Sequence, residues 1–177
     1  TNVAYSITQS DQFEMFVSTG DTVEIALNNP SDGDTVIVNW QHHASSLNCS
    51  TDNPPAIIAS VINLSTARHY AYDPCSDERG TNFEPVDSSG GDYPFSASIP
   101  LQTNDLLIRI KPIFSSSSLR INGSPANIIA IAQYEIDSTA LNPQEEIART
   151  IEVRRSLPGS FSFMDFTLVS GSTLTKN

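Results

Sequence analysis

The sequence predicts an all-β fold: an antiparallel β-sandwich with Greek-key or jelly-roll-like connections and two long loops. Apolar and polar residues alternate in short runs along the whole chain, which is the period of a half-buried strand. Pro, Gly, Ser, Asn and Asp separate these runs, as expected of turns. The segment NPQEEIAR (142–149) could form one helical turn at most. We therefore expect a single β-rich domain over residues 1–177, large enough to bury a core.

The alternation begins at Phe13, Met15 and Val17 and recurs in DTVEIALNN (21–29) and DTVIVNW (34–40). The turn formers NNPSDGD between the last two runs predict that they pair as a hairpin. Further strands are expected in a series of runs: AIIASVINL (56–64), ARHYAYD (67–73), FSASIPL (95–101), DLLIRIKPIF (105–114), SLRING (118–123), ANIIAIAQYEID (126–137), RTIEVRRSL (149–157) and SFMDFTLVSG (162–171).

Two long polar segments, 41–55 and 73–94, fit no strand pattern, and each contains one of the two cysteines. Loops of this length usually carry function or need to be pinned. If the protein is exported, a disulfide between Cys49 and Cys75 would tie the two loops together. The alternative is two free thiols in a reducing compartment. A zinc site has little support, because no C-x-x-C pair or suitably spaced histidine accompanies the cysteines.

Composition favours an exported, extracellular or cell-surface protein. Ser, Thr and Asn are abundant, and three sequons make Asn48, Asn63 and Asn122 candidate glycosylation sites. The formal net charge of −11, from 20 acidic and 9 basic residues, argues against nucleic acid or an anionic membrane as partner. No run of eighteen apolar residues is present, and the chain, which does not begin with Met, is interpreted as a mature or trimmed form.

The residues that could carry chemistry do not form a recognised site. His42 and His43 are adjacent, and neighbours in a strand point to opposite faces, so one metal ion between them is not expected. No G-x-S-x-G motif is present, and we predict no enzyme, no cofactor and no metal. The frequent acids leave a glycosidase-like carboxylate pair open, because the sequence does not give their separation. The acidic loops 31–35 and 73–80 lack the EF-hand pattern and are interpreted as polar turns.

Three of the nine basic residues lie close together, in the segment 148–171. Alternation places Ile151 and Val153 on one face of a strand, with Arg149 and Arg155 at its ends and Arg154 on the other face. Ile151 and Val153 would form the buried pair, so the cluster is interpreted mainly as part of the sheet architecture and secondarily as a contact surface.

Several segments together resemble a known family, the PilX-type pilin-like exported proteins of patescibacteria (candidate phyla radiation), in their globular part. These segments are RTIEVRRSLPGSFSFMDFTLVSGSTL, LLIRIKPIF, RHYAYDP with RGTNFEP, YSITQSDQFEMFV and VIVNW. The resemblance implies a non-catalytic subunit, or soluble head, of a type IV pilus-related extracellular filament, with like subunits or other pilus proteins as partners. The family's hydrophobic N-terminal helix, its link to the membrane, is missing here, and the family offers no active site to transfer.

Two alternatives remain open. The first is an adhesin or lectin-like sandwich that binds surface glycans on Trp40, Tyr70, Tyr72 or Tyr93, although core positions are favoured for three of these four. The second is a filament subunit assembled by strand donation, in which residues 1–10 join a neighbour's sheet.

Overall fold

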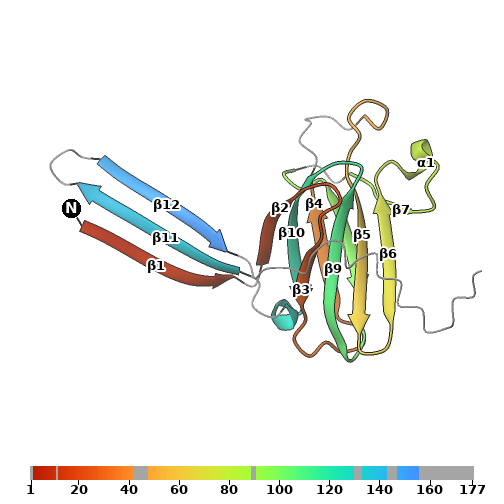
Figure 1. Cartoon of the computed structure of the whole chain (residues 1–177), viewed down its shortest axis with the longest axis horizontal. Coiled ribbons are helices and arrows are strands. Elements are labelled where there is room, and N and C mark those ends of the chain that lie inside the picture. Colours follow the sequence, from red (N-terminus) through yellow and green to blue (C-terminus); the bar gives the residue numbers. More distant parts are fainter. Residues whose placement is uncertain are drawn as a thin grey trace, which may run out of the picture.

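The computed structural model describes the backbone of residues 2–10, 12–41, 48–88, 91–129, 133–142 and 147–155, and the side chains of 12–41, 48–88 and 91–129. Two sheets pack face to face (Figure 1), which confirms the predicted all-β sandwich. The first sheet has four antiparallel strands in the order β2 (Gln12–Val17), β10 (Ser117–Ser124), β4 (Thr35–Trp40) and β8 (Phe95–Pro100).

The second sheet of the sandwich has five strands in the order β3 (Val23–Ala26), β9 (Asp105–Ile113), β5 (Ala56–Asn63), β6 (Ala67–Asp73) and β7 (Glu84–Pro85). Its pairs are antiparallel except for the short parallel pair β6–β7. Two short helices interrupt the strands: α1 (Ser76–Arg79), inside the segment expected to be irregular, and the 3-10 helix η1 (Ala126–Ile128). The run expected as one strand over 126–137 is thus divided between η1 and a later strand.

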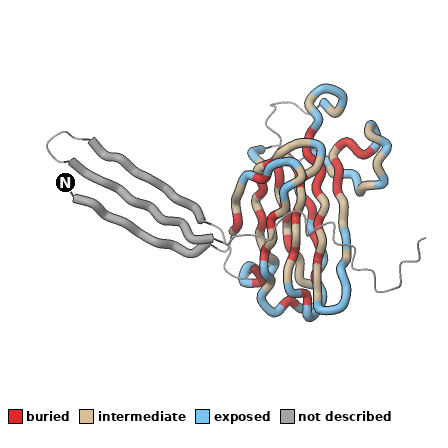
Figure 2. Tube along the Cα trace, in the orientation of Figure 1, coloured by how far each residue is buried: buried red, intermediate tan, exposed pale blue. Residues whose placement is uncertain are grey.

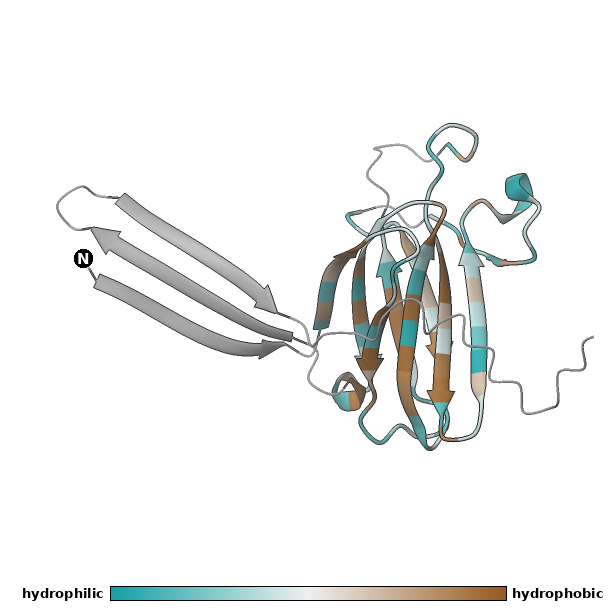
Figure 3. Cartoon of the chain, viewed as in Figure 1, coloured by the Kyte–Doolittle hydropathy of each residue, from teal (hydrophilic) through white to brown (hydrophobic). Residues whose placement is uncertain are grey.

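The core lies between the two sheets and follows the alternation of the sequence. In the four-stranded sheet, one cross-strand row is formed by Phe13, Ile121, Val38 and Ala97, all buried. The facing sheet contributes buried residues from every second position of its central strands, such as Ile57, Ala59, Val61, Ile108 and Ile110. Figure 2 shows buried and less buried positions alternating along the strands, and Figure 3 shows the apolar residues concentrated on them. Apolar burial of this kind stabilises at about 25 cal/mol per Å².

The predicted hairpin between residues 21–29 and 34–40 is wrong. β3 pairs with β9 in the five-stranded sheet, whereas β4 pairs with β10 and β8 in the four-stranded sheet. The connecting turn formers, with Asn29 and Gly33 at positive φ, carry the chain from one sheet to the other. Seven residues easily span the roughly 10 Å between packed sheets, so the same turn chemistry serves a crossover.

A third sheet stands to one side of the sandwich in Figure 1 and consists of three antiparallel strands. Its order is β1 (Asn2–Ser10), β11 (Gln133–Asn142) and β12 (Ile147–Arg155). The expected strand around Arg149–Arg155 is therefore present, and its register places Arg154 opposite Glu135. The burial predicted for Ile151 and Val153, and the expected strand 162–171, lie outside what the structure describes.

Candidate functional site

The two long loops lie at one end of the sandwich, where a disulfide joins them. Cys49 and Cys75 are bonded, with their Cα atoms 5.6 Å apart and a sequence separation of 26. This confirms the predicted cross-link. Cys75 has no accessible surface, so the bond anchors the second loop inside the fold. Disulfides of this kind persist in oxidising compartments, which places the protein in an extracellular or periplasmic environment.

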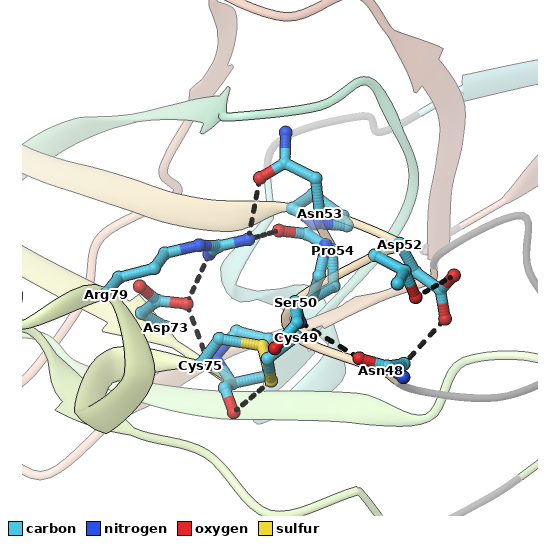
Figure 4. The surroundings of a disulfide bond; sticks show 12 residues. Asn48, Cys49, Ser50, Asp52, Asn53, Pro54, Asp73, Cys75 and Arg79 are labelled. Atoms are coloured by element: carbon cyan, nitrogen blue, oxygen red, sulfur yellow. Dashed lines mark hydrogen bonds and ion pairs between the residues drawn. A yellow bond between two sulfur atoms is a disulfide. The ribbon is translucent and has the colours of Figure 1, made fainter.

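A buried ion pair lies beside the disulfide (Figure 4). The Asp73 carboxylate at the end of β6 is fully buried and accepts a hydrogen bond from Arg79 Nη1 at 2.6 Å. It also accepts from the backbone N–H of Cys75 at 2.8 Å and from the Thr81 hydroxyl at 3.2 Å. Helix α1 brings Arg79 to this position and ends at Gly80, whose φ of 64° is the left-handed conformation that glycine adopts most easily.

The other side of the same guanidinium reaches the first loop. Arg79 Nη2 donates to the Pro54 carbonyl at 2.6 Å and to the Asn53 side-chain oxygen at 3.1 Å. The central carbon of the Arg79 guanidinium, Cζ, lies 4.2 Å from the centre of the Phe114 ring, a cation–π distance. Asn53 in turn donates to the Phe114 carbonyl at 2.9 Å. Arg79 therefore joins β6, the first loop and the turn after β9, and together with the disulfide it forms what we call the loop clamp: Cys49, Asn53, Pro54, Asp73, Cys75, Arg79 and Phe114.

Only part of the loop clamp could be predicted from the sequence. The disulfide was predicted, whereas Arg79 and Phe114 were missed because Asn53, Pro54 and Phe114 are distant from Arg79 in the chain. Phe114, which is 41% exposed and adopts a φ of 70°, presents an aromatic surface at the loop end. A positive φ is rare for an aromatic residue. In this conformation the Phe114 ring contacts Arg79 and the Phe114 carbonyl accepts a hydrogen bond from Asn53.

The aromatic residues predicted as contact platforms lie elsewhere. Trp40 has no accessible surface, packs against Phe95 and donates its ring N–H to the Pro55 carbonyl at 2.9 Å, so it cannot stack on a ligand. Tyr72 is also a core residue, which agrees with the core positions favoured in the sequence. Burial raises the pKa of the Tyr72 hydroxyl above its ordinary value, and the charge of Glu84 adds to this.

The two remaining tyrosines are partly buried and contact arginines. Tyr70 packs against the core, and its hydroxyl accepts from Arg68 Nε at 3.4 Å. The guanidinium carbon of Arg120 lies over the ring of Tyr93, 4.2 Å from the ring centre. Both tyrosines are partly buried, and each contacts an arginine of the sandwich, Arg68 for Tyr70 and Arg120 for Tyr93. Their main role is therefore in packing within the fold.

The three sequons occupy different environments. Asn48 lies in an exposed turn and Asn63 ends β5 at the turn into β6, and their side-chain oxygens accept from following backbone N–H groups. Asn122 lies within β10, the second strand of the four-stranded sheet, and donates to Gln12 at 3.2 Å. Glycan attachment requires an accessible loop asparagine, so the turns at Asn48 and Asn63 suit it better than the strand at Asn122.

The acidic loop 31–35 behaves as the polar turn that the sequence indicated, whereas 73–80 contains helix α1 and the buried carboxylate of Asp73. Asp32 accepts from the backbone and hydroxyl of Thr103, and Asp34 accepts from the backbone of Ser31. Within the residues whose side chains are described, Cys49, Cys75 and Glu78 come together in the manner of a metal site. The disulfide occupies both sulfurs, and a metal requires thiolates, so this group does not suit an ion. The exposed His69 on β6 forms a hydrogen bond through Nδ1 with the hydroxyl of Ser60 on β5. His42 and His43 lie outside the described residues.

No family model matches the chain, and no curated protein matches it. In the part of the chain that the structure describes, no helix is long and apolar enough to cross a membrane.

Proposed function

We propose that this chain is a non-catalytic structural protein of the cell exterior, the pilin-like head of an extracellular filament subunit. The observation that carries the proposal is the polarity of the sandwich. The loop clamp lies at one end, whereas β1 and β11 leave from the opposite end. β2 begins beside Asn122 and finishes beside Ser117, and Ser117 donates to the Gln41 carbonyl at the start of the first loop.

This arrangement suits a subunit that displays one end and assembles through the other. A disulfide and a buried ion pair hold the displayed loops, and loops on a rigid scaffold commonly carry recognition. The resemblance to PilX-type proteins supports the same function. Like subunits or other pilus proteins are then the partners, and the displayed loops face the exterior.

Immunogold labelling of intact cells and of thin sections of the encoding organism would test this function. Label along extracellular filaments is the expected result, and label confined to the cytoplasm would overturn the proposal. Mass spectrometry of the native protein would check that Cys49 and Cys75 are bonded in the labelled material.

The adhesin alternative has one observation in its favour, the exposed Phe114 ring held by Arg79 at the loop end. Binding of the purified protein to a glycan array, lost in a Phe114→Ala variant that remains folded, would favour that function. In the strand-donation alternative, residues 1–10 pair with a neighbour, whereas here β1 pairs with β11 of its own chain. Regular fibres of the purified chain in negative-stain images would favour an exchange of that pairing.

A further inference from the structure

The register of the three-stranded sheet sorts its residues into two unlike faces. Because side chains alternate along a strand, residues opposite one another in the register share a face. Ile7, Ile136 and Val153 form one cross-strand row. The rows on that face hold mostly apolar residues: Val3, Tyr5, Ile7, Tyr134, Ile136, Ala140, Ile147, Ile151 and Val153.

The opposite face of the same sheet is polar. Its rows hold mainly Ser6, Thr8, Glu135, Asp137, Thr139, Thr150, Glu152 and Arg154. A three-stranded sheet with one apolar face becomes stable when another layer covers that face. In the described residues the two sheets of the sandwich pack on each other, and Figure 1 shows the three-stranded sheet beside them.

Charge separates the three-stranded sheet from the sandwich. Residues 12–129 contain thirteen acidic and five basic residues, a net charge of −8, whereas the strands of the three-stranded sheet contain three of each. The loop between β11 and β12 adds Glu145 and Glu146, so these strands and that loop together have a net charge of −2. Two copies of the chain therefore repel less at this sheet than through their sandwiches. Arg155 belongs to one end row of the apolar face and Arg149 to the last row that all three strands share at the other end, where interfaces normally have a polar rim.

The size of the face sets the strength of such a contact. Strands about 4.8 Å apart, with nine or ten residues rising about 3.3 Å each, give a footprint of roughly 450 Å² per copy. Two copies together then bury on the order of 900 Å² before the relief of side chains is counted, at the small end of specific interfaces. Contacts of this size are transient, so a concentration-dependent equilibrium is expected.

We propose that a second copy of this chain packs its own β1–β11–β12 sheet, apolar face to apolar face, on this one. The inference deepens the proposed function by naming the surface through which like subunits meet, and it rests on that function for its role in assembly. The product is a pair of sheets about 10 Å apart, with the two acidic sandwiches directed away from each other.

Sedimentation equilibrium of the full chain over about 1–500 μM would test this self-association, since contacts of this size are weak. Ile136→Glu places a carboxylate on the central strand of the apolar face and should weaken dimerisation by about 100-fold or more, because an unpaired charge would be buried. Thr139→Glu, on the same strand and the opposite face, is the matched control and should change dimerisation by less than about 3-fold.

Cross-linking keeps the inference testable if Ile136→Glu does not fold. A short bismaleimide should link Ile136→Cys into dimers and leave Thr139→Cys monomeric, because only the first position lies between the two sheets. A wild-type chain that stays monomeric at every concentration, or equal cross-linking at the two positions, would overturn the inference. A monomer destabilised by Ile136→Glu would show that another segment of the same chain covers the face. Gold-labelled filaments would still support the proposed function in those cases, so the two failures are distinguishable.

Discussion

Replacing Arg79 by methionine should cost this fold more than any surface charge. Methionine keeps an apolar stem of similar length, but the Asp73 carboxylate, which has no accessible surface, loses its ionic partner. It keeps the backbone N–H of Cys75 and the hydroxyl of Thr81 as neutral donors, and the Pro54 carbonyl loses its bond from the guanidinium. Breaking a buried pair from one side costs about 3–5 kcal/mol. We expect the free energy of unfolding to fall by about 4 kcal/mol and the melting temperature by roughly 10 °C.

Urea unfolding followed by tryptophan fluorescence is the natural assay, because Trp40 is the single tryptophan of the chain and is fully buried. Arg109→Met is the matched control. Arg109 pairs with Glu24 at 2.8 Å on partly exposed side chains, and such pairs contribute about 1 kcal/mol or less. If Arg79→Met shifts the stability no more than Arg109→Met does, the loop clamp is not the stabilising element that we infer.

Three further predictions concern the other cross-links and buried polar groups. Replacing Cys49 and Cys75 by serine should lower the free energy of unfolding by about 3.5 kcal/mol for their separation of 26 residues, and reducing the wild type should reproduce the shift of the urea midpoint. Burial raises the pKa of Tyr72, so the unfolded state ionises first and stability falls as the pH rises from about 10 through the folded pKa. The variant Tyr72→Phe should flatten the stability–pH profile in that range, and an unchanged profile would contradict this reasoning. Arg68→Met would leave the buried carboxylate of Asp105 without its partner at 2.6 Å, and a loss of about 3 kcal/mol in urea unfolding is expected.

The strands and their inward-facing residues could be predicted because alternation is a local signal. Val36, Val38 and Trp40 read as one face of a strand in the sequence and form one buried face in the structure. The partner of that strand could not be predicted in the same way. Turn formers are needed both in a hairpin loop and in a connection between two packed sheets, so NNPSDGD does not distinguish them.

In the candidate site, too, one part could be predicted from the sequence and another part could not. Two cysteines in an exported chain have one possible intramolecular pairing, and the disulfide follows from that. Arg79 is one charged residue in a polar loop, and its contacts with Asn53 and Pro54 span 26 and 25 residues. Long-range contacts of this kind depend on how β5, β6 and β9 are packed, so no local sequence pattern predicts them.

The distribution of charge and the polarity of the sandwich together make the salt dependence of self-association informative. If copies meet through the three-stranded sheet, which is less acidic than the sandwich, added salt screens the repulsion between sandwiches of net charge −8, since the Debye length falls from about 10 Å at 0.1 M to about 3 Å at 1 M. Dimerisation should then strengthen as salt rises. If instead Arg149 and Arg155 of one copy contacted the acidic sandwich of another, salt would weaken the attraction. Sedimentation equilibrium at 0.05 M and 1 M salt, both roughly chosen to bracket the screening range, therefore separates sheet-to-sheet packing from an electrostatic contact, and weaker association at high salt would refute the first.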